Sequence, residues 1–157
     1  MTLNCRTVGR RDTGPAPALY RLLADGALSR AALDACACPV AIVDAASAPH
    51  RVTHVNSAFA ALFGHTESTA CGRGLADLIF AGEETRAARL FDAPPGAWVR
   101  RTFRATHRNG DLRIVEAALA PLRDADGGTR GWVVSFFDCS ELAALREEVA
   151  ALRSRAA

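Results

Sequence analysis

The hydrophobic positions at the start of this chain recur at helical spacing. Leucines follow that spacing within residues 17–25, and Ser29 stands where it can cap a second helix over residues 29–37. Upstream, residues 1–15 are polar and end at a Gly-Pro breaker. We therefore predict a disordered tail over residues 1–15 and an N-terminal helical cap over residues 16–37.

The pattern then changes to short apolar runs, which are typical of strands. Residues 39–45 and 51–56 form two such runs. A short helix is predicted after them, because Phe59, Leu62 and Phe63 share one helical face.

Further helical turns are expected around residues 72–79, and a longer helix at residues 83–91. Three more strands follow, and the Asn-Gly pair at residues 109–110 is a strong signal for a hairpin between the first two. These strands are predicted at residues 98–108, 111–122 and 131–139. Strands that are adjacent in sequence pair antiparallel, so the order of elements predicts an α+β domain over residues 38–139. We expect a five-stranded antiparallel sheet with short helices on one face.

Helical spacing returns in the C-terminal segment, residues 140–157. Ser140 is a candidate cap, and the apolar residues Leu142, Leu145, Val149 and Leu152 alternate steps of three and four, as in a coiled coil. A coiled coil of two heptads is marginal when isolated. The helix is therefore predicted to pair with a second copy of itself in a homodimer, or to pack on the sheet.

Composition limits the classes of partner. The 157 residues carry a net charge of +2, and all 19 basic residues are arginine, so the charge does not indicate a nucleic-acid partner. No apolar run approaches the about 20 residues that cross a bilayer, and the N-terminus lacks a signal peptide. The five cysteines fit no disulfide framework. We predict a cytoplasmic protein with no membrane partner.

The order of elements, together with particular residues, resembles the PAS domain family. The matching features are an Asn-x-x-Phe helix start at Asn56, a basic-x-Gly hairpin at residues 108–110 and an Asp-x-Ser exit at residues 138–140 into the last helix. The closest resemblance is to LOV domains, especially short bacterial ones. The resemblance implies the PAS fold and a sensory or dimerisation role in signal transduction, with output to a downstream signalling protein.

The chain departs from the LOV pattern wherever that pattern contacts flavin. Leu75 replaces the photoactive cysteine, and Ala76 replaces the arginine that holds the phosphate. Ala105 and Val115 replace the two asparagines that contact flavin, and Phe136 replaces the glutamine that senses it. Each buried polar group left unpaired costs about 1–3 kcal/mol. We therefore predict no bound cofactor and no covalent flavin photochemistry.

Strand alternation gives a candidate pocket. Alternation places Ala105, Val115, Ala117 and Phe136 on the face toward the helices. The resemblance adds Leu75 and Asn56 to this candidate pocket, whose residues are mostly apolar. Such a set forms either a filled core or a dry cavity for a small apolar ligand.

Other functions stay open at this stage. The first is a photo- or redox receptor that binds FMN or FAD without the adduct-forming cysteine. Haem is another cofactor to consider, but His50, His54, His65 and His107 offer no evident axial ligand. A small α+β enzyme is the third, but the inward residues include no acid/base pair and the sequence has no Gly-x-Ser-x-Gly motif. We predict that the protein is not an enzyme.

Overall fold

The computed structural model describes residues 26–47, 49–80, 90–92 and 98–156. The chain divides into two compact units, residues 1–32 and 33–157. The first unit is described only from residue 26, at the start of helix α2 (Gly26–Ala35). The predicted tail, the helix at residues 17–25 and most of the helix at residues 83–91 lie outside the described residues.

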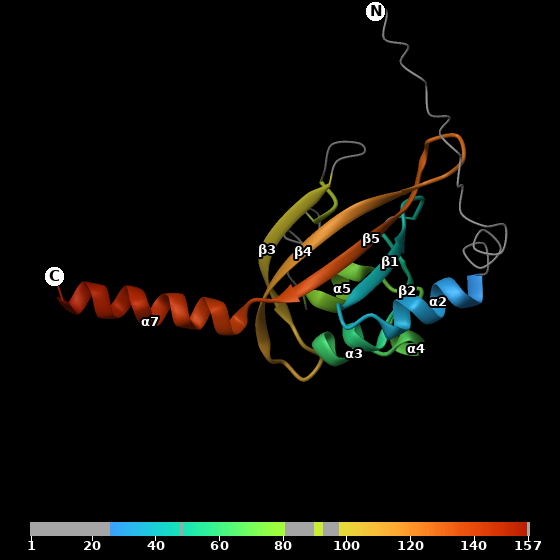
Figure 1. The fold of residues 1–157 in the computed structure, drawn as a ribbon. Coiled ribbons are helices and arrows are strands. Elements are labelled where there is room, and N and C mark those ends of the chain that lie inside the picture. Colours follow the sequence, from blue (N-terminus) through green and yellow to red (C-terminus); the bar gives the residue numbers. More distant parts are fainter. Residues whose placement is uncertain (1–25, 48, 81–89, 93–97, 157) are drawn as a thin grey trace, which may run out of the picture. The chain divides into compact units, whose positions relative to one another are not determined.

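A five-stranded antiparallel sheet forms the second unit (Figure 1), as the sequence predicted. Its strand order is β2-β1-β5-β4-β3. The strands are β1 (Val40–Asp44), β2 (Val52–Val55), β3 (Val99–Thr106), β4 (Leu112–Arg123) and β5 (Thr129–Asp138). The long strands β4 and β5 lie in the interior of the sheet, and β3 is an edge strand.

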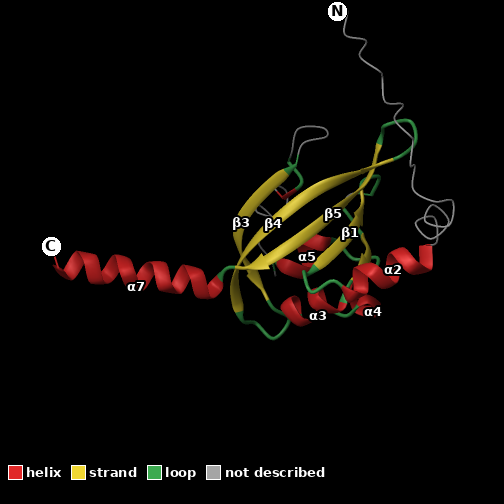
Figure 2. Cartoon of the chain, in the orientation of Figure 1, coloured by secondary structure: helices red, strands yellow, loops and turns green. Residues whose placement is uncertain are grey.

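Three short helices cover one face of this sheet (Figure 2): α3 (Ser57–Phe63), α4 (Glu67–Ala70) and α5 (Leu75–Ile79). The predicted face of α3 is correct, because Phe59, Leu62 and Phe63 are all buried. The inward residues of β4 and β5 complete the core: Val115, Ala117, Leu119, Trp132, Val134 and Phe136. The α+β fold is confirmed.

Helix α7 (Ser140–Ala156) continues directly from the end of β5 (Figure 1). The apolar seam of α7 consists of Leu142, Leu145, Val149 and Leu152, which are 48%, 52%, 46% and 56% exposed. Among the described residues, no helix has the length and apolar character needed to span a membrane.

Two predictions of helix caps were wrong. Helix α2 begins at Gly26, so Ser29 lies inside the helix and does not cap it. Ala27 and Leu28 are good helix formers, which explains why the helix extends upstream of the serine. Ser140 is the first residue of α7, but its hydroxyl accepts a hydrogen bond from the backbone N–H of Ile114 instead of capping the helix.

Candidate functional site

Asn56 joins the segment before β1 to the start of α3. Its Oδ1 accepts hydrogen bonds from the backbone N–H groups of Val40 at 2.9 Å and Phe59 at 3.0 Å. Its Nδ2 donates to the carbonyl oxygens of Leu33, Cys36 and Cys38, at 3.0, 3.2 and 2.8 Å. Because backbone groups occupy the whole amide, Asn56 holds the fold together and offers no polar atom to a ligand.

The other five candidate pocket residues lie in one hydrophobic core. Leu75, Ala105, Val115, Ala117 and Phe136 are each 0% exposed. The Phe136 ring packs against two rings of α3, with centroids 5.7 Å from Phe59 and 5.0 Å from Phe63. Aromatic side chains of α3 therefore pack directly against Phe136. Binding of a small apolar ligand among them stays a prediction.

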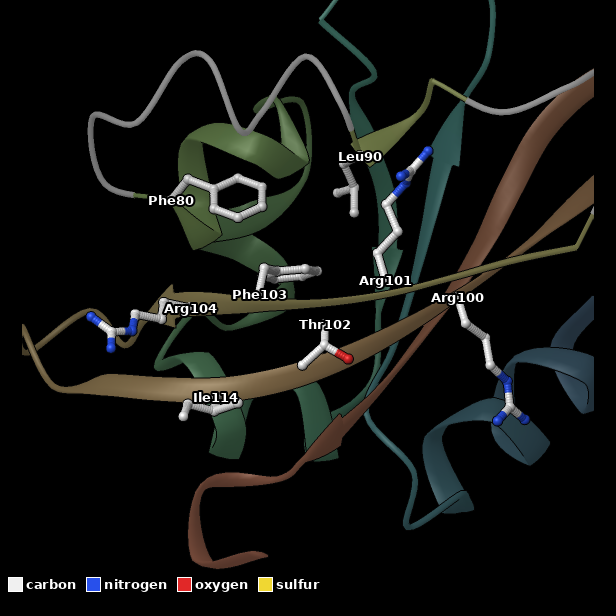
Figure 3. Close-up of a pocket in the computed structure, with 8 residues that line it drawn as sticks. All are labelled: Phe80, Leu90, Arg100, Arg101, Thr102, Phe103, Arg104 and Ile114. Atoms are coloured by element: carbon white, nitrogen blue, oxygen red, sulfur yellow. The ribbon is translucent and has the colours of Figure 1, made fainter. Parts of the chain in front are cut away.

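The structure contains an open groove along the edge strand β3, which sequence reasoning missed (Figure 3). Its volume is about 630 Å³. The groove is lined by Phe80, Leu90, Arg100, Arg101, Thr102, Phe103, Arg104 and Ile114. The available signal was the arginine-rich run at residues 100–104, but only the fold shows that Phe80 and Leu90 approach it.

Four hydrogen bonds lie at what we call the output junction, residues 113–114 and 138–140, where β5 ends and α7 begins. Arg113 Nη1 donates to Asp138 Oδ2 at 2.8 Å, and Asp138 Oδ1 accepts from the Ser140 N–H at 2.9 Å. The Ile114 N–H donates to Ser140 Oγ at 2.9 Å, and the Ile114 carbonyl accepts from the Cys139 N–H at 2.7 Å. Strand β4 is therefore bonded directly to Cys139 and to Ser140, the first residue of the helix.

The electrostatics of the output junction favour an ionised Asp138. Burial alone would raise the pKa of Asp138, but the hydrogen bonds from Ser140 and Arg113, together with the Arg113 charge, outweigh it. The pKa of Asp138 consequently lies below its ordinary value. The carboxylate stays charged near neutral pH, where it accepts both bonds.

Each of the four histidines has contacts within the protein. His54 Nδ1 lies 2.9 Å from Glu67 Oε1, and His107 Nδ1 lies 2.6 Å from Asn109 Oδ1. The His50 ring lies 4.1 Å from the Phe91 ring, between centroids. Burial lowers the pKa of His65, and nearby arginine charges add to the shift. Among the described residues, no cluster of three or more His, Cys, Asp or Glu side chains is arranged to hold a metal ion.

A family model described as the PAS fold matches residues 33–144. The chain belongs to the PAS family. No curated protein matches it. Membership of this family supports the sensory, signal-transduction role predicted from the sequence.

Solved structures share the PAS fold of this chain. An RNA-binding Light-Oxygen-Voltage receptor is 22% identical, with a TM-score of 0.74 over 94% of this chain. The chain spans only 41% of that receptor's length. The LOV protein of Rhodobacter sphaeroides is 20% identical, with a TM-score of 0.61, and the match covers 73% of this chain and 70% of that one. A PAS domain from Colwellia psychrerythraea is 13% identical, with a TM-score of 0.63, and the match covers 78% of this chain and 98% of that domain.

Proposed function

We propose that this chain is a PAS sensory and dimerisation module whose core relays a change through the output junction to α7. The observation that carries the proposal is the pair of bonds between Ile114 and residues 139–140. A shift of β4 along β5 would break or remake these bonds at the first turn of α7. A change in the core would therefore shift the equilibrium between two positions of the start of α7.

The output in this proposal is the pairing of α7 with α7 of a second copy. The α7 seam is about half exposed along its length and follows coiled-coil spacing. A lone helix of this length gains little from its own hydrogen bonds, so a partner helix would stabilise it. A homodimer through Leu142, Leu145, Val149 and Leu152 supplies that partner and presents the helix to a downstream signalling protein.

The residues present do not fit a flavin. Leu75, Ala105, Val115 and Phe136 stand where the LOV pattern has its cysteine and flavin-contacting amides, and all four are apolar and fully buried. A flavin's polar edge would be left without partners there, at about 1–3 kcal/mol for each group. We propose that the module works without flavin photochemistry and that it catalyses no reaction. We also propose that it acts in the cytoplasm.

Native mass spectrometry of the protein purified from its own host tests this function. We expect a dimer that carries no flavin, because the core lacks partners for one. An absorbance spectrum of the same sample is the control, and it should show neither a blue flavin band nor a haem Soret band. A yellow preparation with stoichiometric flavin would overturn the proposal in favour of the receptor that binds FMN or FAD.

A further inference from the structure

A buried histidine, His65, lies in the turn between α3 and α4 and is only 7% exposed. We propose that His65 is a proton-sensitive contact between α3 and the β3–β4 turn, residues 107–111, and that charging its ring loosens α3 from this turn. His65 belongs neither to the hydrophobic core cluster nor to the lining of the β3 groove. The inference rests on the proposed function only for the consequence at α7.

The His65 ring is placed where its charged form lacks a hydrogen-bond acceptor. Its Nδ1 atom is buried, and the described part of the chain offers that atom no hydrogen-bond partner. A neutral imidazole carries one N–H, so its Nδ1 needs no acceptor when the hydrogen is on the other nitrogen. The imidazolium ion carries a hydrogen on both nitrogens. Protonation therefore leaves a buried N–H unpaired, which disfavours the charged form.

Positive groups from two other segments also act on His65. Arg73 follows α4, and His107 and Arg108 belong to the β3–β4 turn. Burial lowers the pKa of His65 most, and the charges of Arg73, Arg108 and His107 lower it further, whereas a hydrogen bond to the Leu78 backbone opposes the shift. The ring therefore charges only at a pH below the ordinary histidine pKa of about 6.5.

The β3–β4 turn is held closely against the end of α3, as Figure 2 shows. The Arg108 N–H donates to the Phe63 carbonyl at 2.9 Å. Gly64 has a φ of 77°, and a Cβ atom added to it would lie 2.8 Å from the His107 ring. Because little space separates the helix end from the turn, repulsion between a charged His65 and Arg108 acts to push them apart.

The same turn leads into the output junction. The His107 N–H donates to the Asp111 carbonyl at 2.8 Å, and β4 begins at the next residue. Ile114, the third residue of β4, is hydrogen-bonded to Cys139 and Ser140 at the start of α7. Under the proposed function, movement of the turn in acid would therefore reach α7.

An NMR titration of the His65 ring protons in the full chain tests the site directly. We expect a midpoint below the ordinary value of about 6.5, because burial and the neighbouring positive charges both disfavour the imidazolium ion. The variant His65→Gln assigns the signal by its loss. A midpoint at or above about 6.5 would overturn the inference.

Hydrogen exchange of the Arg108 amide tests the loosening, since this amide donates to α3. Its protection factor, corrected for intrinsic exchange, should fall at least about threefold between about pH 7.5 and about pH 5. The variant His65→Phe keeps an aromatic ring but cannot titrate, so its protection factor should not fall. In the control His50→Gln, which removes a histidine elsewhere, the fall should match that of wild type. Equal falls in wild type and His65→Phe would contradict the proton-sensitive contact.

Two further measurements keep the site and the relay to α7 separable. If His65→Phe does not fold, the wild-type titration still decides the site. The Cys139 amide, which donates to the Ile114 carbonyl, reports on the output junction. A fall in protection at both amides would support the site and the relay. A fall at Arg108 alone would support the site and contradict the relay, and no fall at Arg108 would overturn the inference.

Discussion

Arg113 Nη1 lies 2.8 Å from Asp138 Oδ2 and so joins β4 to the last residue of β5. The same carboxylate accepts a hydrogen bond from the Ser140 N–H through its other oxygen. One side chain therefore connects two strands and the first residue of α7. Changes at this carboxylate should affect the sheet and the helix together.

The pH dependence of stability should reflect Asp138. The pKa of Asp138 in the folded state is below its ordinary 3.8, so the folded state binds its proton less readily than the unfolded state. The ionised Asp138 therefore adds to the free energy of unfolding above about pH 4, and this addition is lost as the pH falls through the lower pKa of the folded state. The side chain is 34% exposed, so screening limits this contribution to about 1 kcal/mol or less.

Urea unfolding of wild type and Asp138→Asn checks this prediction. The asparagine variant should be less stable at about pH 6, and the difference in free energy of unfolding should be smaller at about pH 3, because below about pH 4 the unfolded state binds the proton more readily than the folded state. A difference that stays constant between these pH values would show that the charge of Asp138 does not contribute.

Phe136 should be far more important for stability than its neighbour Phe137. Phe136 is 0% exposed and packs against Phe59 and Phe63, whereas Phe137 points to the other face of β5 and is 50% exposed. Phe136→Ala should cost about 3–5 kcal/mol in free energy of unfolding, because it leaves a cavity. Phe137→Ala should cost less than about 1 kcal/mol. Similar losses in urea titrations would mean that the core is not packed as described.

Asn56→Ala should destabilise the protein by at least about 3 kcal/mol. The substitution removes the side-chain partner of two buried backbone N–H groups and of two part-buried carbonyl groups, and each buried group left unpaired costs about 1–3 kcal/mol. Ser57→Ala is the control: it loses one exposed hydrogen bond to the Asp34 carbonyl and should cost under about 1 kcal/mol. Chemical denaturation of the two variants makes the comparison, and a mild Asn56→Ala would contradict the role given to this amide.

The α7 seam should control the oligomeric state. Leu142→Glu/Leu145→Glu places charges at coiled-coil contact positions and should lower the dimer fraction. The control, Ala144→Glu/Ala151→Glu, adds the same charges at exposed positions off the seam and should leave that fraction unchanged. Light scattering measures the mass of each variant. An unchanged mass in the leucine variant would remove the coiled-coil dimer from the proposed function.

The sequence was most informative where a local pattern determines structure. The Asn109-Gly110 hairpin formed as predicted, with Gly110 at a φ of 98° that favours glycine. Strand alternation also identified the inward residues correctly, because one face of the sheet must be buried.

Features that depend on distant contacts were missed. Local spacing favoured capping roles for Ser29 and Ser140, but the hydroxyl of Ser140 bonds to Ile114, 26 residues away. Helix α4 was not predicted either, since four residues are too few for a periodic signal. The β3 groove depends on Phe80 and Leu90 reaching a strand that follows them in sequence, which no local pattern reveals.

The dimer dissociation constant of Ser140→Ala, measured by sedimentation velocity, tests most directly whether the sheet and α7 are coupled. The hydroxyl of Ser140 bonds to β4, so its loss should weaken dimerisation by about fivefold, equivalent to about 1 kcal/mol. Ser154→Ala, which removes a hydroxyl that bonds only within α7, should leave the constant unchanged. The same dissociation constant for Ser140→Ala and wild type would contradict the coupling.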